Sequence, residues 1–347
     1  MAVPKRVLVV DDQAVIRKLL TDIINTSPLL TVVGEAADPL IARDEIKRLN
    51  PDVITLDIEM PRMDGLTFLK NLMRLRPMPV VMISTLTERG APATLEALEL
   101  GAVDYIAKPT QNLQANLSAY SDELIDKVVT AANAHVRQLK LEKTKNIQTA
   151  ASTGVRYKSQ HLFAIGASTG GTEAIKEVLL DMPEDCPPIV IAQHIPPVFS
   201  TSYAMRLDAS CAMNVHEASH GQIIEPGNVY IAPGDDHLTV RKKGVMLVCA
   251  LDQADPVNRH RPSVDVLFDS VAVVAQQNST AAILTGMGKD GAEGLLNIRN
   301  AGGITIAQDE ETSVVWGMPG AAVGIDAAGQ VMPLQEIARK MLFYAKK

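Results

Sequence analysis

Five residues that could hold a metal ion or a phosphoryl group each stand directly after a short apolar run: Asp11, Asp12, Asp57, Ser84 and Lys108. Ligands gather beyond the carboxyl ends of parallel strands, so these side chains are expected at one edge of a sheet. Crowded carboxylates repel each other unless a cation joins them, and hard oxygen ligands suit Mg²⁺. Asp57 could then be an acyl-phosphate nucleophile whose phosphoryl oxygens pair with Lys108. Taken singly, each of these residues is also a common turn former.

A second candidate site begins at GASTGGTEAI, residues 166–175, which follows the apolar run LFAI. Gly166, Ser168 and Gly170 fit the G-x-S-x-G turn, in which small neighbours expose a serine hydroxyl between a strand and a helix. The apolar residues that follow recur at helix spacing, so Ser168 is expected near a helix N-terminus, where developing negative charge is favoured. The alternative is a glycine-rich turn in which Ser168 or Thr169 only caps the helix.

A serine nucleophile needs a base, and the base needs an orienting carboxylate. Of the seven histidines, His194 alone stands just past a clear apolar run, PIVIAQH. Asp290 follows the run AAIL in the loop TGMGKDG. Ser168, His194 and Asp290 are therefore predicted to meet at one sheet edge as a catalytic triad. Their order along the chain differs from the Ser, Asp, His order of α/β-hydrolases, so no simple transfer from that family is made.

The same loop carries a rival motif. Residues 286–291 read G-x-G-x-x-G between a strand and a helix, and Asp309 lies about 20 residues further on, as the dinucleotide-binding fingerprint requires. Against a dinucleotide-dependent enzyme, the turn contains charged Lys289 and Asp290, and a nicotinamide site would leave Ser168 and His194 without a task. A site-forming loop around Asp290 explains the same glycines.

The elements that must position these residues alternate along the chain. Strand-like runs at 6–10, 30–36, 52–56, 79–83 and 103–107 alternate with helical patterns, which predicts βαβ units and a parallel sheet. After a polar stretch, the alternation restarts with strands near 162–165, 188–192, 281–284 and 303–307. The pattern at 228–251 predicts an inserted β-hairpin with its turn near KKG.

We therefore expect an α/β protein with two domains. An N-terminal domain at 1–138, including its C-terminal helix, is joined by a linker at 139–157 to a second domain at 158–347, a doubly wound and mainly parallel sheet with an inserted hairpin. A chain of 347 residues is long enough for two cores.

Composition limits the classes of function. The net charge is −7 and aromatic residues make up 3%. Neither a basic face for a nucleic-acid backbone nor base stacking is indicated, so no nucleic-acid partner is expected. Three cysteines without CxxC spacing favour a reducing compartment. With no apolar leader and no long apolar stretch, we expect a cytoplasmic protein without membrane insertion. We also expect a monomer.

The segments VLVVDD, LDIEMPRMDG, MIST and YIAKP, in this order over roughly residues 4–120, resemble a two-component receiver domain. The resemblance implies a flavodoxin-like (βα)₅ fold and phosphorylation of Asp57 by a histidine kinase or a small phosphodonor. It also implies Mg²⁺ binding by Asp12, Asp57 and the backbone carbonyl of Glu59 with help from Asp11, phosphoryl binding by Lys108, and switch roles for Ser84 and Tyr105.

The second half resembles the catalytic domain of the chemotaxis protein-glutamate methylesterases, the CheB family, through IGASTGGTEAI, IAQHIPP, YIAPGDDHL, VNRHRPSVDVLF, ILTGMGKDGAEG and VWGMP. The resemblance places nucleophile, base and acid on Ser168, His194 and Asp290. It makes the backbone N–H of Met287 the oxyanion donor and Thr169 a residue that seats His194.

The same resemblance implies a phosphorylation-activated hydrolase that demethylates glutamate 5-methyl esters on chemoreceptors, releasing methanol, and deamidates receptor glutamines. Mg²⁺ would serve the receiver, and the esterase reaction would need no cofactor. A receiver docked over the Ser168 edge would block a large substrate until Asp57 is phosphorylated. The alternative from another class is a receiver-controlled transcription regulator, which the acidic second half without a visible helix-turn-helix disfavours.

Overall fold

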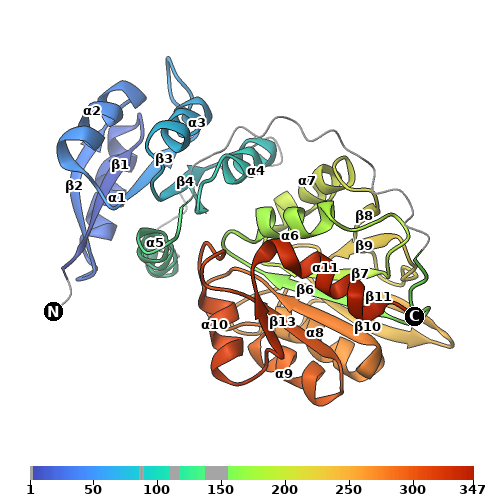
Figure 1. The fold of residues 1–347 in the computed structure, drawn as a ribbon. Helices are drawn as coiled ribbons and strands as arrows, with labels where there is room; N and C mark the ends of the chain where they lie inside the picture. The colour runs from blue at the N-terminus through green and yellow to red at the C-terminus, as the bar shows by residue number, and fades with distance from the viewer. Residues whose placement is uncertain (1–2, 86, 88–89, 109–116, 137–154) are drawn as a thin grey trace. The chain divides into compact units, whose positions relative to one another are not determined.

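The computed structural model describes residues 3–85, 87, 90–108, 117–136 and 155–347, and the chain divides into two compact units, Met1–Leu141 and Glu142–Lys347 (Figure 1). Each unit is considered by itself. Residues 139–154 of the expected linker lie outside the described residues. Tyr157, near the end of that linker, forms a β-bridge with Lys346.

The first unit is a five-stranded sheet with strand order β2-β1-β3-β4-β5, and every described pair of neighbouring strands is parallel. This order is the flavodoxin-like one and confirms the expected fold. The strands are β1 (Lys5–Val10), β2 (Leu30–Ala36), β3 (Val53–Asp57), β4 (Val80–Ser84) and β5 (Asp104–Ala107). The helices are α1 (Ala14–Ile24), α2 (Pro39–Leu49), α3 (Gly65–Leu75), α4 (Ala91–Glu99) and α5 (Leu117–Ala132).

Local signals start two of these helices. The Asp38 carboxylate accepts hydrogen bonds from the first backbone amides of α2, and Pro39 occupies a first-turn position that needs no N–H donor. The Asp64 carboxylate caps α3 in the same way, at Thr67 N. Helix α5 ends at Ala132, and residues 133–136 after it are not helical.

The second unit contains a seven-stranded sheet with order β14-β13-β12-β6-β7-β9-β8, again with parallel neighbours throughout. The strands of this sheet are β6 (Leu162–Ala167), β7 (Ile189–Gln193), β8 (Asn214–Glu217), β9 (Asn228–Ile231), β12 (Ser279–Ile283), β13 (Ile304–Gln308) and β14 (Gln330–Met332). The helices are α6 (Gly171–Leu180), α7 (Pro197–Asp208), α8 (Val264–Val274), α9 (Ala292–Asn300), α10 (Gly317–Gly324) and α11 (Leu334–Ala345), with a short 3₁₀ turn at Gln276–Asn278. Strands β12 and β7 flank β6 on opposite sides, so the chain order reverses there and the sheet is doubly wound.

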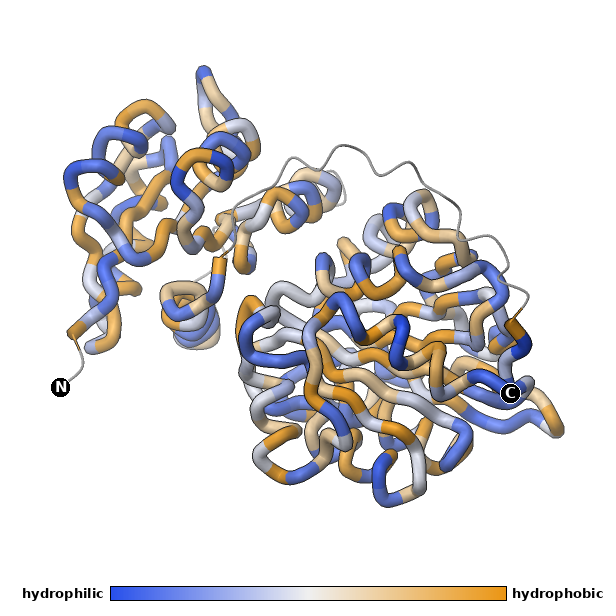
Figure 2. The backbone as a smooth tube through the Cα atoms, in the orientation of Figure 1, coloured by the Kyte–Doolittle hydropathy of each residue, from blue (hydrophilic) through white to orange (hydrophobic). Residues whose placement is uncertain are grey.

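Alternate residues of the central strands build the core on each face of this sheet. Leu162 and Ala164 of β6 pack in one cluster with Phe268 of α8 and Leu295 of α9. Because side chains alternate along a strand, the intervening residues face the other side, where α6 and α11 lie together (Figure 1). The hydropathy tube shows the same layering, with apolar strands inside and polar stretches on the outer turns (Figure 2).

The inserted hairpin exists but is shorter than expected. It consists of β10 (His237–Lys243) and β11 (Met246–Asp252), which pair antiparallel around Gly244. Strand β9, which the sequence pattern assigned to the hairpin, instead pairs parallel with β7 in the main sheet. The pattern failed because a short apolar run does not reveal its partner strand.

A buried histidine makes the stability of this unit sensitive to acid. His161 is 2% exposed, its Nε2 lies 2.9 Å from Thr280 Oγ1, and its Nδ1 has no hydrogen-bond partner among the described residues. Burial, with a smaller effect of Lys158, lowers the pKa of His161 to about 4. In the unfolded chain the His161 imidazole takes up a proton near pH 6.5, whereas in the folded unit it does so only near pH 4. The free energy of unfolding therefore decreases as the pH falls from 6.5 to 4.

We expect His161→Gln to flatten this acid response. The drop in unfolding free energy between pH 7 and pH 4.5 should be smaller by about 2 kcal/mol in the variant than in wild type. Trp316 is the single tryptophan and lies in the second unit, so its fluorescence during urea unfolding reports on this unit alone. The exposed His220→Gln is the matched control and should follow wild type; equal pH responses of all three proteins would contradict the prediction.

Candidate active site and phosphoacceptor site

Three residues from three strand ends meet at the carboxyl edge of the seven-stranded sheet. Ser168 follows β6, His194 follows β7, and Asp290 stands between β12 and α9. His194 Nδ1 lies 3.0 Å from Ser168 Oγ, and His194 Nε2 lies 2.8 Å from Asp290 Oδ2. The structure thus brings the three predicted residues into one hydrogen-bonded chain with the spacing of a nucleophile, base and acid.

The hydrogen bonds determine which nitrogen of His194 can act as a base. A carboxylate only accepts hydrogen bonds, so the ring nitrogen facing Asp290, Nε2, carries the proton. Nδ1 is then the acceptor that faces the Ser168 hydroxyl. The arrangement is ready to move the Ser168 proton to Nδ1.

The Asp290 carboxylate is 1% exposed and is held by donors on both oxygens. Oδ2 accepts from Val264 N at 2.6 Å as well as from His194, and Oδ1 accepts from Asn258 Nδ2 and Ser263 Oγ at 2.8 Å each, with Asp265 N at 3.3 Å. Two of these donors are the first backbone amides of α8, where the helix dipole favours negative charge. Burial opposes ionisation of this carboxyl, but His194, Asn258 and Val264 outweigh it and lower its pKa.

The turn that carries Ser168 needs glycine at two points. Gly170 has φ of +74°, a left-handed conformation, and precedes the first residue of α6. Gly286, in the loop after β12, lies so close that an added Cβ would stand 2.8 Å from Ser168 Cβ. Gly286 therefore lets the loop after β12 approach the turn after β6, and Gly170 supplies the left-handed residue of that turn.

The structure gives other roles to residues of the rival dinucleotide-binding motif. A Cβ on Gly291 would meet Val264 Cγ1 at 2.4 Å, so this glycine packs against α8. The Asp309 carboxylate accepts hydrogen bonds from Thr312 N and Thr312 Oγ1, a local turn. Gly286 and Gly291 thus have packing roles around the Ser168 edge, and Asp309 belongs to a turn of its own.

Gln193 is a site residue that the sequence analysis missed. Its Nε2 donates to the carbonyl oxygens of Ser168, at 3.0 Å, and of His194, at 3.2 Å, so one amide holds the backbone of both residues. Gln193 is 3% exposed and ends β7 directly before His194. The only signal in the sequence was this position, a polar residue at the end of a buried strand.

His260 is another residue that the sequence analysis set aside. Its ring stacks on that of His194, with centroids 3.6 Å apart and planes 11° apart. His237 lies in a hairpin pattern as well, yet it is 1% exposed and its Nδ1 accepts from Ser263 N. Local sequence around these two histidines did not reveal their contacts, because both depend on segments that meet only in the folded chain.

Thr169 and Met287, the two remaining residues of the predicted site, each follow a residue of the Ser168 edge. Thr169 follows Ser168, and its carbonyl accepts a hydrogen bond from Thr285 Oγ1 at 3.0 Å. Met287 follows Gly286, the residue packed against Ser168. Their roles as seat for His194 and as oxyanion donor stay predictions.

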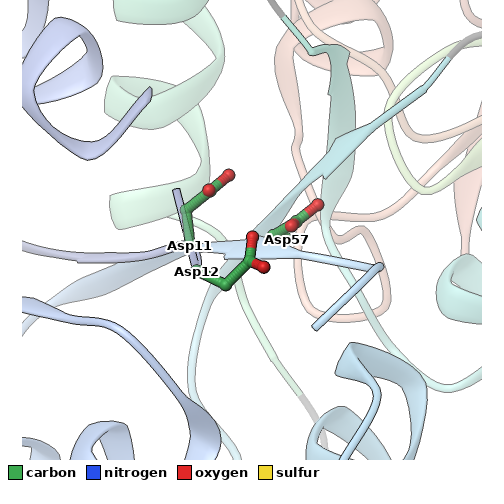
Figure 3. Close-up of side chains that lie close together, drawn as sticks. All are labelled: Asp11, Asp12 and Asp57. Carbon is green, nitrogen blue, oxygen red and sulfur yellow. The ribbon is translucent and has the colours of Figure 1, made fainter. Parts of the chain in front are cut away.

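In the first unit, three carboxylates converge as the sequence indicated. One oxygen each of Asp11, Asp12 and Asp57 lies within 4.8 Å of the others (Figure 3). The buried Asp12 Oδ1 has no hydrogen-bond partner among the described residues. Clustered carboxylate oxygens with an unsatisfied member fit Mg²⁺, which takes one or two carboxylates and keeps several waters.

Lys108 is the cation already present in this cluster. Its Nζ lies 2.8 Å from Asp57 Oδ2 and 3.2 Å from Asp11 Oδ2. Burial, together with the charge of Asp11, raises the pKa of Asp57 to about 6, although Lys108 and the Glu59 backbone amide oppose the rise. A second cation would relieve this repulsion, which agrees with a site for a divalent ion. The Glu59 carbonyl as a metal ligand stays a prediction.

The two predicted switch residues lie in β4 and β5, the strands next in order after β3, which ends at Asp57. Ser84 ends β4, is 1% exposed, and its Oγ lies 2.5 Å from Thr94 Oγ1 in α4. Tyr105 lies in β5, where Lys127 Nζ stands 4.9 Å from its ring centroid and donates to its carbonyl. Their roles as switch hydroxyl and switch aromatic stay predictions.

Fold and site together define a two-unit protein in which a receiver accompanies a serine-hydrolase type of site on a doubly wound sheet. The family described as CheB methylesterase matches residues 163–341, and the response regulator receiver domain matches residues 7–118. The chain belongs to the CheB methylesterase family, as the sequence motifs predicted.

Curated relatives agree with this assignment over nearly the whole chain. A protein of Saccharophagus degradans named protein-glutamate methylesterase/protein-glutamine glutaminase 2 is 56% identical, covering 99% of each chain. A Hahella chejuensis protein named protein-glutamate methylesterase/protein-glutamine glutaminase 1 is 58% identical, covering 96% of this chain and 94% of its own. The crystal structure of the Thermotoga maritima CheB methylesterase catalytic domain is 41% identical, with a TM-score of 0.52, and covers 53% of this chain and 97% of its own.

Among the described residues, every helix is too short or too polar to cross a membrane.

Proposed function

We propose that this chain is a phosphorylation-activated protein-glutamate methylesterase and protein-glutamine glutaminase that acts on chemoreceptors in chemotactic adaptation. The observation that carries the proposal is the Ser168, His194 and Asp290 chain of hydrogen bonds at the sheet edge. Family membership supports the activity, and the receiver supports its control by a kinase phosphodonor.

The reaction begins with a receptor glutamate 5-methyl ester at Ser168. His194 Nδ1 takes the hydroxyl proton as Ser168 Oγ attacks the ester carbonyl, and Asp290 stabilises the imidazolium that forms. Backbone N–H groups, among them that of Met287, stabilise the oxyanion. The protonated His194 then gives its proton to the departing methoxide, and methanol leaves an acyl-enzyme.

Water completes the cycle. His194 Nδ1 removes a proton from the water that attacks the acyl carbonyl, then returns it to Ser168 Oγ, which frees the receptor glutamate. A receptor glutamine can follow the same path with ammonia as the leaving group, which also ends in glutamate. The base, the acid and the nucleophile supply this chemistry from the chain itself, and the proposal includes no cofactor at this site.

The receiver supplies the control. Asp57 would take the phosphoryl group while Asp11, Asp12, Asp57 and the Glu59 carbonyl hold Mg²⁺, which neutralises charge on the transferring group. Lys108, already bound to Asp57, would pair with the phosphoryl oxygens, and Ser84 and Tyr105 would report the change to the receiver surface. The unphosphorylated receiver would restrict access of the receptor substrate to Ser168, and phosphorylation of Asp57 would relieve this restriction. A monomer in the cytoplasm is part of this proposal.

The test is methanol release from methylated chemoreceptor membranes by the full-length protein, with and without acetyl phosphate and Mg²⁺. We expect the phosphodonor with Mg²⁺ to raise the rate about 10-fold, the range of a typical coupling energy. Chelation of Mg²⁺ or Asp57→Asn should remove the rise and leave the basal rate. Asp22→Asn, an exposed acid of α1, is the matched control and should respond as wild type does.

No methanol release under any condition would overturn the proposed substrate. A phosphodonor response that survives in Asp57→Asn would overturn the role of the receiver site while leaving the esterase in place.

A further inference from the structure

One amide side chain stands between two buried carboxylates beside the proposed site. Asn258 Nδ2 donates to Asp290 Oδ1 over 2.8 Å and to Asp265 Oδ2 over 2.7 Å. An amide NH₂ group has two hydrogens, so each carboxylate receives one of them.

A tight turn fixes the position of this amide. The backbones of Val257 and His260 pair in both directions, at 3.1 Å and 2.9 Å, around Asn258 and Arg259. Asn258 and Arg259 have φ of 52° and 69°, the left-handed conformation that asparagine tolerates better than most residues. The same turn stacks His260 on His194, so it touches both the base and the acid of the proposed triad.

Asp265 holds the other side of the amide. It is 8% exposed, and its Oδ1 accepts a hydrogen bond from Gly294 N of α9 at 2.7 Å. Its backbone N–H donates to Asp290 Oδ1, so Asp265 is hydrogen-bonded both to Asp290 and to helix α9, which follows Asp290. Nothing in the proposed reaction uses this buried carboxylate.

We infer that Asn258 and Asp265 are positioning residues for the proposed reaction: Asp265 fixes the Asn258 amide, and that amide fixes the Asp290 carboxylate toward His194. The inference rests on the proposed roles of Ser168, His194 and Asp290. In metal sites, partners that hold the groups orienting a ligand histidine typically contribute about 10- to 100-fold in affinity or activity, and we expect a loss of the same order here. Burial and the nearby charge of Asp290 raise the pKa of Asp265 to about 6, which agrees with two carboxylates held close by a shared donor.

The bridge should affect the rate of the reaction rather than substrate binding, because both amide hydrogens face carboxylates. In the full-length protein with acetyl phosphate and Mg²⁺, Asn258→Ala should lower kcat for methanol release about 10- to 100-fold and change KM less than about 2-fold. Asp265→Asn should also lower kcat, since its new NH₂ group would face a donor, either the Asn258 amide or Gly294 N.

The double variant separates a bridge from two independent roles. If Asp265 acts through Asn258, Asn258→Ala should cost much less in the Asp265→Asn background than in wild type, so the losses will not multiply. Asp265→Asn keeps the size of the side chain. If Asn258→Ala impairs folding, the kcat of Asp265→Asn still tests the bridge. Thermal midpoints measured by Trp316 fluorescence identify any variant that is not folded.

Asn297→Ala is the matched control. Asn297 Nδ2 also donates to a carboxylate of α8, Asp269 Oδ1, over 2.8 Å, but on an exposed surface. Its kcat should equal that of wild type.

Unchanged kcat in both single variants, losses that multiply in the double variant, or a loss confined to KM would each overturn the bridge. Ser168→Ala in the same assay separates this result from the proposed function. Wild-type activity that disappears in Ser168→Ala while both bridge variants keep full kcat would reject the bridge alone. Equal activity of Ser168→Ala and wild type would reject the proposed site, and the bridge with it.

Discussion

Replacement of Ser168 by alanine should lower the rate of methanol release at least about 10⁴-fold while leaving the fold intact. Without Oγ no acyl-enzyme can form, and loss of a serine nucleophile typically reduces hydrolase turnover to what the oxyanion donors and binding alone provide. Ser168 is partly exposed at the sheet edge, and its Oγ contacts His194, so removal of one oxygen leaves no large cavity. The measurement is methanol released from methylated receptor membranes with acetyl phosphate and Mg²⁺.

Ser210→Ala is the matched control for this variant. The Ser210 hydroxyl donates to the Arg206 carbonyl near the end of α7, so its loss should not change the rate. Release of ammonia from a receptor glutamine should fall in parallel with methanol release in Ser168→Ala, because both reactions pass through the same acyl-enzyme. Methanol release within about 10-fold of wild type would show that Ser168 is a turn residue.

The second large effect is expected for Asp290→Asn, with kcat about 10⁴-fold lower and KM little changed. Both oxygens of Asp290 face donors, His194 and Val264 on one side and Asn258 on the other. The NH₂ group of an asparagine must therefore face a donor in either orientation. Where it faces Nε2, His194 has to carry its proton on Nδ1 and can no longer accept the proton of Ser168.

Asp269→Asn serves as the control, because Asp269 is an exposed carboxylate of the same helix that accepts from Asn297. It should retain full activity. Asp290→Asn should also lower the unfolding free energy by about 1 to 3 kcal/mol, since a buried donor loses its acceptor. Activity near that of wild type in a folded Asp290→Asn protein would remove Asp290 from the proposed mechanism.

The ends of these strands could be predicted from the sequence because the apolar run that marks each strand is a local pattern. The apolar runs before Asp57, Ser168 and His194 are short, buried strands, and parallel strands place the residues after them at a common edge. Family motifs added the assignment to the receiver and methylesterase families, which the comparisons confirmed. The roles of the site residues in the reaction stay predictions.

Some parts of the fold were misjudged because their partners are distant in sequence. Strand β9 has an apolar run like that of a hairpin strand, and only its pairing with β7 puts it in the main sheet. The burial of His237 and the stacking of His260 on His194 likewise depend on segments that meet only in the folded chain.

The sequence by itself determined the two α/β units, their strand ends and the identity of the residues that meet there, since periodicity and turn chemistry act over a few neighbouring residues. Only the tertiary structure decided that Nδ1 of His194 faces Ser168, that Gln193 holds both backbones, and that Asn258 bridges two carboxylates. Three of those contacts join residues 25 to 32 positions apart, whereas Gln193 and His194 are neighbours and Asn258 and Asp265 are seven positions apart. Their geometry follows from packing of the sheet and helices, which no local pattern encodes.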